Sequence, residues 1–111
     1  MRQYQIKFTR QAREQMYDTV RYLSKELASP QTAYHWVEKI EHAVSSLAQF
    51  PNRVPLTEEE PWRSQGIRKM PVQNFLVYFW VDEEHLRVQI TAVIYGKRDQ
   101  LRALSQMNLK P

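Results

Sequence analysis

The chain has 111 residues, of which 42% are apolar, and this is enough for one ordinary domain with a single core over residues 1–111. It contains no cysteine, which excludes a disulfide framework and thiolate metal ligands. Sixteen lysines and arginines against twelve acids give a net charge of +4, which favours an acidic partner or nucleic acid without identifying either.

The opening MRQYQIKFTR lacks the apolar stretch of a signal peptide. No later run approaches the roughly 20 apolar residues that a membrane span needs. We therefore expect a soluble, unexported, cytoplasmic protein.

The first half of the chain predicts one strand and two helices. Residues Tyr4–Phe8 alternate apolar and polar side chains, as in a short half-buried strand. Thr9 is placed to cap a helix over about Arg10–Leu27, where apolar residues recur every three or four positions. Ser29-Pro30 is a good N-cap and first-turn pair for a second helix, which runs to about Gln49. Helices with so short a linker are expected to fold back as an antiparallel hairpin.

The second half predicts a loop and then strands. Three prolines indicate a loop over Phe50–Gln65, and from Gly66 the apolar period changes to two. Strands are expected at Ile67–Val72, Phe75–Val81 and Leu86–Tyr95, and a short terminal helix at Asp99–Met107. Gln73-Asn74 is the expected turn between the first two strands, and Pro71 weakens the first of them.

The last strand shows the clearest alternation, and one face of it is expected to carry Leu86, Val88, Ile90, Ala92 and Ile94. The order β-α-α-β-β-β predicts an α+β domain. In it, an antiparallel helical hairpin covers one side of an antiparallel sheet of about four strands, with a short helical tail.

The common enzyme signatures are missing. With only two glycines there is no phosphate-binding loop, and neither a nucleophile elbow nor a His/Asp set at metal spacing is found. His35 and His42 could share one helix face, but without a third ligand they are better explained as solvated positions. His85 lies in a charged turn, and Glu58 to Glu60 form an acidic loop that could hold a general base but is more simply solvated. No metal site and no cofactor are expected.

A basic group is the strongest candidate for function. It comprises Arg68 and Lys69 on one strand, Lys97 and Arg98 after the last strand, and Tyr78 and Tyr95 nearby in register. Such cations and phenols can bind phosphate and stabilise the charge of an in-line attack on RNA. They can equally clamp an acidic protein segment, or form a plain solvated sheet edge. The aromatic residues Tyr4, Phe8, Trp36, Phe75, Phe79 and Trp80 follow the apolar pattern and are expected in the core.

Four segments carry a family resemblance: YQIKFTRQAREQM, SLAQFP, GIRKMPVQNFLVYFWVDEE and VQITAVIYGKRDQL. In this order and spacing they resemble the RelE/ParE superfamily of toxins, also labelled plasmid stabilisation proteins. The resemblance covers nearly the whole chain. It implies the same α+β architecture, a toxin that arrests bacterial growth, and a cognate antitoxin, usually encoded beside it, that wraps the toxin with an extended segment.

RelE-like members cleave mRNA in the ribosome, and the chain matches their functional residues only in part. Arg68 stands at a sheet lysine, and Arg98 stands at the arginine after the last strand. Phe75 stands where those members have a strand arginine, and Leu104 where they have a tail tyrosine. Tyr95 lacks the histidine that precedes it in YoeB-like members. Because losing a charge-stabilising cation costs orders of magnitude in rate, this arrangement disfavours an RNase. The catalytic residues are unknown; for an RNase they would be Arg68, Lys69, Tyr95, Lys97 and Arg98.

ParE-like members inhibit DNA gyrase without a catalytic site, and the RDQLRAL tail resembles theirs. The resemblance therefore favours a ParE-like gyrase inhibitor, with a ribosome-dependent mRNA interferase as the alternative. We expect an acidic and apolar antitoxin segment to lie across the helical hairpin and sheet, and the two chains could form a higher-order assembly. The expected antitoxin- or target-binding residues are Arg68, Lys69, Tyr78, Tyr95, Lys97, Arg98 and Arg102.

Overall fold

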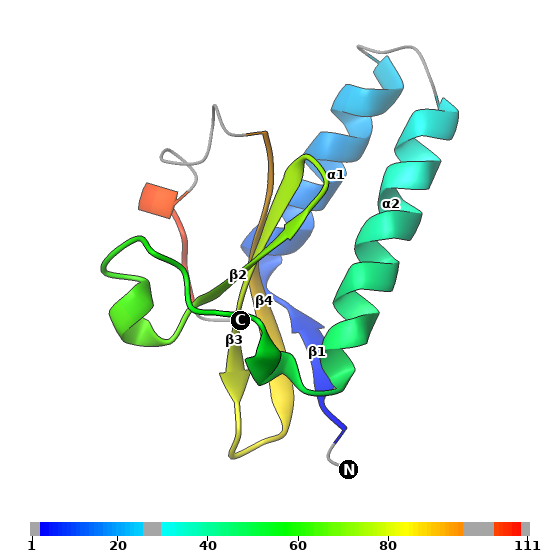
Figure 1. Ribbon diagram of the computed structural model, residues 1–111. Helices are drawn as coiled ribbons and strands as arrows, with labels where there is room; N and C mark the ends of the chain where they lie inside the picture. Colours follow the sequence, from blue (N-terminus) through cyan, green and yellow to red (C-terminus); the bar gives the residue numbers. More distant parts are fainter. Residues whose placement is uncertain (1–2, 26–29, 97–103, 110–111) are drawn as a thin grey trace.

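Two helices pack as an antiparallel hairpin on one face of a four-stranded sheet, as Figure 1 shows for the computed structural model. The structure describes residues 3–25, 30–96 and 104–109. Its elements are β1 (Gln5–Phe8), α1 (Arg10–Lys25), α2 (Pro30–Ser45), β2 (Arg68–Val72), β3 (Phe75–Asp82) and β4 (Arg87–Tyr95). The α+β class and the order of elements are as predicted. Within the described ranges, no helix has the length and apolar character to cross a membrane.

The helices begin where the sequence predicts. The Thr9 hydroxyl caps α1 by accepting a hydrogen bond from the Ala12 N–H, 3.2 Å away. The predicted cap at Ser29 and the end of the first helix at Leu27 lie outside the described residues. The second helix ends earlier than predicted, because α2 stops at Ser45 and a single 3₁₀ turn, η1 (Ser46–Ala48), continues it.

The strand order is β1-β4-β3-β2, and β1 pairs with β4 in parallel. The prediction of a fully antiparallel sheet was wrong in this respect. The helical hairpin brings the chain back to the end at which β1 begins, so β2 runs in the same direction as β1. Two tight hairpins then return β4 to that direction, beside β1.

A β-bulge in β4 corrects a second prediction. Tyr78 pairs with Ala92 but Phe79 pairs with Ile90, so Thr91 is the extra residue. One extra residue reverses which side chains face which side of the sheet. Val88 and Ile90 therefore pack under the helices, whereas Ala92 and Ile94 pack on the opposite face.

Both faces of the sheet are consequently covered. The main core lies between the sheet and the helices and includes Ala12, Leu23, Trp36, Ile40, Val44, Phe75, Val77 and Phe79. A second cluster on the other face comprises Ile67, Tyr78, Ala92, Ile94, Leu104 and Met107, with Trp62 packed against it. The prediction that helices cover one side of the sheet was therefore incomplete, because the other side is covered as well. Of the predicted terminal helix, residues 99–103 lie outside the described ranges, and Leu104 and Ser105 are helical.

Pro71 lies on the outer edge of the sheet, where its missing N–H removes no ladder bond. The Lys69 N–H points outward and donates to the Pro55 carbonyl at 3.3 Å. The same alternation places the Pro71 nitrogen on the outer side two residues later. A proline is therefore compatible with this strand because β2 is an edge strand.

Candidate functional site

Arg68, the first candidate cation, is hydrogen-bonded to the backbone of its own chain. Its Nη1 atom donates to the Val54 carbonyl at 2.6 Å and to the Asn52 carbonyl at 3.3 Å. The half-buried guanidinium thus holds the loop before β2 against the sheet. Both of these bonds use Nη1, so this end of the guanidinium is committed to the loop.

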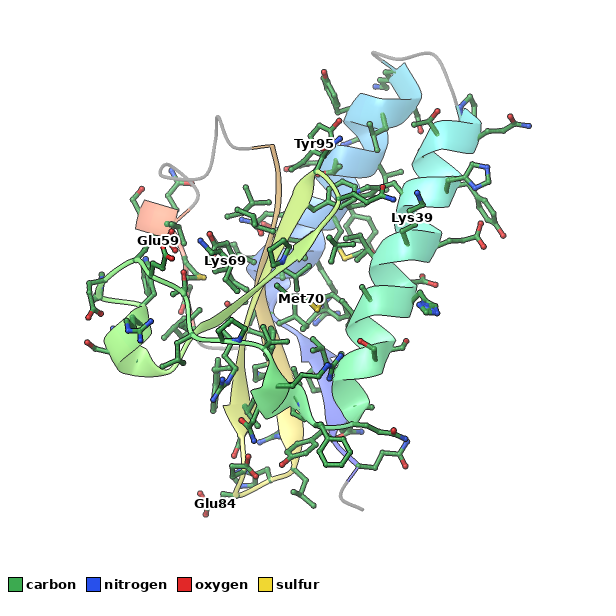
Figure 2. All side chains as sticks on the ribbon, in the orientation of Figure 1. Lys39, Glu59, Lys69, Met70, Glu84 and Tyr95 are labelled. Atoms are coloured by element: carbon green, nitrogen blue, oxygen red, sulfur yellow. The ribbon has the colours of Figure 1, made fainter. Side chains whose placement is uncertain are left out.

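Lys69, the second candidate cation, forms an ion pair within the chain. Its Nζ atom lies 3.0 Å from Oε2 of Glu59, and the two side chains are 22% and 24% exposed. Figure 2 shows them side by side. Partial burial by itself would raise the pKa of Glu59. Hydrogen bonds from Thr57 and Lys69 and the positive charge of Lys69 outweigh it, so the pKa lies below its ordinary value. Of the predicted acidic loop, Glu59 is therefore an ion-pair partner.

The structure does not bring the four described candidates together on one surface. Neighbouring residues of a strand point to opposite faces, so Arg68 and Lys69 are separated by the sheet. Tyr78 pairs with Lys69 in register and is fully buried in the second cluster. Tyr95 lies at the far end of β4, where its ring packs against Phe75 at a centroid distance of 5.3 Å. The remaining candidates, Lys97, Arg98 and Arg102, lie outside the described residues.

Phe75 and Leu104, the two positions at which the chain departs from the expected RelE-like residues, are both in the core. Phe75 is 5% exposed, and its ring meets that of Trp36 edge-on at 4.9 Å. Leu104 is 4% exposed and packs in the second cluster. Neither side chain presents a polar group, and neither faces solvent.

The histidines and the remaining acids have local roles. His35 lies 3.8 Å from Glu38 on the exposed face of α2, and His85 lies 2.9 Å from Asp82 in the β3–β4 loop. Glu60 accepts hydrogen bonds from the backbone N–H and the hydroxyl of Ser64. Among the described residues, no group of three or more histidines and acids is placed to hold a metal ion.

The family model described as "ParE toxin of type II toxin-antitoxin system, parDE" matches residues 6–100. The chain belongs to this family of toxins. The fold of the toxin is similar to a chain from the chromosomal ParDE toxin-antitoxin system of P. aeruginosa, with a TM-score of 0.70 and 22% identity over 87% of this chain and 100% of that chain.

The toxin is also similar to a chain of the RelBE2 toxin-antitoxin complex from Mycobacterium tuberculosis, with a TM-score of 0.60 and 23% identity over 86% of this chain and 93% of that chain. At such identities the two likenesses show the fold alone. No curated protein matches the chain.

Sequence reasoning missed a second candidate surface, at the opposite end of the sheet from Tyr95. Phe50 and Leu86 are large apolar residues that the structure exposes there. The available signals were weak: Phe50 is an aromatic residue directly before a proline in a predicted loop, and Leu86 was assigned to a strand. Leu86 in fact precedes β4 and ends the β3–β4 loop.

Proposed function

We propose that this toxin arrests growth by inhibiting DNA gyrase, without cleaving RNA itself, and that a cognate antitoxin neutralises it. The burial of Phe75 and Leu104 carries the proposal, because these are the positions at which an mRNA-cleaving member would need an arginine and a tyrosine. A cation stabilises a transition state only when it faces the reacting phosphate. Two apolar side chains in the core supply neither charge nor a proton.

The engagement of Arg68 and Lys69 supports the same proposal. Arg68 is bonded to two backbone carbonyls, and Lys69 is paired with Glu59. An RNase that used Lys69 would have to compete with Glu59, and one that used Arg68 would have to leave Nη1 bonded to the loop. A protein inhibitor needs only a complementary surface, and so the fold can keep both cations in place.

The decisive experiment is inducible expression of the toxin, with and without the neighbouring gene, while an SOS reporter and primer-extension maps of abundant mRNAs are followed. Gyrase inhibition predicts growth arrest with SOS induction and intact messages, and rescue by the antitoxin. Codon-positioned cuts without SOS induction would instead establish an mRNA interferase. Absence of arrest would contradict toxin activity.

Purified components separate direct from indirect effects. Added to gyrase and relaxed plasmid, the toxin is expected to block supercoiling, and equimolar antitoxin is expected to restore it. If the purified toxin leaves supercoiling unchanged while expressing cells still induce the SOS response, the toxin damages DNA through a target other than gyrase.

A further inference from the structure

Two large apolar side chains are exposed on residues with an unfavourable backbone. Phe50 is 63% exposed and Leu86 is 36% exposed, and each has a φ of 51°. Residues with a Cβ rarely adopt this left-handed conformation, and glycine or asparagine is the usual choice. Gln73 also has a positive φ, but it is polar and sits in the tight β2–β3 turn that requires one. A requirement of the fold alone does not explain a phenylalanine or a leucine.

Hydrogen bonds place both residues at the same end of the molecule. Asn52, two residues after Phe50, donates to Glu83 in the β3–β4 loop at 2.9 Å. The Tyr4 hydroxyl donates to the other oxygen of Glu83 at 2.7 Å, and the Leu86 carbonyl accepts from the Gln5 N–H. This end also holds the start of β1 in Figure 1 and Glu84 in Figure 2.

The Phe50 backbone is held firmly by Arg53. The Nη1 atom of Arg53 donates to the carbonyls of Gln49 at 2.8 Å and Phe50 at 3.0 Å. Its Nη2 atom donates to the Ser46 hydroxyl at 2.9 Å. Phe50 is thus exposed by a fixed loop, which lowers the entropy cost of using its ring as an interface anchor.

A polar groove of about 690 Å³ adjoins Phe50 through Gln49. It is lined by Gln3, Glu38, Glu41, His42, Ser45, Ser46, Ala48 and Gln49. Glu38 and Glu41 contribute negative charge to it, and Arg53, which donates to Ser46 and Gln49, lies beside it, so the acids exceed the neighbouring arginine by one. The exposed Glu84 adds a further acid in the loop that carries Leu86.

We infer that Phe50, Leu86 and this groove form a docking surface, the anchor end, for a basic segment of the toxin's target protein. The inference rests on the proposed function, in which that target is gyrase. Apolar anchors beside acidic groups fit a segment with lysine or arginine next to apolar side chains. The same acids repel phosphates, so a basic protein segment fits this surface better than nucleic acid does. The anchor end is separate from the surface around Lys69.

The test uses Phe50→Asn with Leu86→Asn in the full chain. Asparagine tolerates a left-handed backbone, so the variant is expected to melt at the same temperature as wild type or higher. Its affinity for purified gyrase subunits, measured by biolayer interferometry, is expected to fall about tenfold or more, and supercoiling inhibition with it. Antitoxin affinity is expected to stay unchanged. Tyr34→Ala is the matched control, because Tyr34 is 64% exposed on the outer face of α2.

A second variant tests the groove. Glu38→Gln with Glu41→Gln is expected to weaken gyrase binding and to reduce its dependence on salt, because two complementary charges are removed. Unchanged gyrase binding by the Phe50/Leu86 variant, or loss of antitoxin in its place, would overturn the inference and leave the proposed function intact. A wild-type toxin that neither binds nor inhibits gyrase would overturn both.

Discussion

Lys69 is a predicted partner-binding cation that forms an ion pair within its own chain. Its ammonium group pairs with the Glu59 carboxylate, which also accepts a hydrogen bond from the buried Thr57. Because this pair is mostly buried, it is less screened than a surface pair. Any acidic partner that reaches Lys69 has to compete with Glu59.

The Glu59–Lys69 pair predicts a specific loss of stability in acid. The pKa of Glu59 is lowered in the folded chain, so below its ordinary value of 4.5 the unfolded chain binds the proton first. The contribution of Glu59 to the free energy of unfolding is therefore expected to be constant above about pH 5. It is expected to fall as the pH drops from 4.5 through the folded pKa of Glu59. Urea denaturation across this range measures it.

Glu59→Gln is the variant that isolates this contribution, and its acid-dependent loss is expected to be smaller than that of wild type. Some dependence is expected to remain because of Asp82. Partial burial would raise its pKa, but the hydrogen bonds from His85 and the charges of His85 and Arg87 lower it on balance. Identical pH profiles for wild type and Glu59→Gln would rule out a stabilising role for the pair.

At the scale of the elements, two glutamines of α1 take the place of backbone groups. Where β4 extends beyond β1, the Gln15 side chain accepts a hydrogen bond from the Val93 N–H at 2.8 Å. One turn earlier, the Gln11 side chain donates to the Gln106 carbonyl at 2.7 Å and accepts from the Asn108 N–H at 2.8 Å. Gln11 therefore helps to fix the position of residues 104–109 on the sheet, together with the hydrogen bond from the Thr91 hydroxyl to Met107 Sδ at 3.2 Å.

Gln11→Met tests these two hydrogen bonds, because methionine has a similar volume and can form neither of them. Hydrogen exchange of the Asn108 amide is expected to accelerate roughly tenfold, corresponding to about 1–2 kcal/mol of local stability. The melting temperature is expected to change little, since the core is untouched. Gln31→Met, on the exposed face of α2, is the control. Unchanged exchange at Asn108 would show that contacts other than those of Gln11 hold the segment.

Local patterns predicted the elements well but not their pairing. The periods of 3.6 and two located both helices and all four strands, because burial on one side imposes them. The parallel partner of β1 depends on contacts across the whole chain. The bulge at Thr91 falls in a run where Ala92, Val93 and Ile94 are all apolar, so alternation gave no sign of which side each would face.

The arrangement of the candidate site residues could not be read from the sequence, for a physical reason. Arg68 and Lys69 are adjacent in sequence, and adjacency in a strand separates side chains rather than gathering them. The sequence also does not show which charged side chains are already hydrogen-bonded within the chain. The carbonyls that bind Arg68 belong to a loop whose sequence has no regular pattern. The assignments of Arg68, Lys69, Tyr78 and Tyr95 to a partner-binding surface remain predictions.

At the scale of the whole molecule, the sheet is a middle layer. Helices cover one face, and Trp62, Leu104 and Met107 cover the other. Most of β4 is buried as a result, which explains why its sequence is apolar on both sides. Covering both faces increases the apolar surface that the chain buries. This is important for stability in a domain of 111 residues, because small domains bury a smaller fraction of their surface.

Pro71 also bears on how the free toxin behaves at high concentration. An exposed sheet edge is a template on which identical chains can stack into fibrils. The outer edge of β2 donates from Lys69 to the Pro55 carbonyl and lacks a donor at Pro71, so this edge does not offer a continuous row of bonding groups. Pro71→Val is therefore expected to shorten the lag before thioflavin-positive aggregates form, while the folded structure is kept. Equal lag times for both chains would mean that something other than this proline keeps the toxin dispersed.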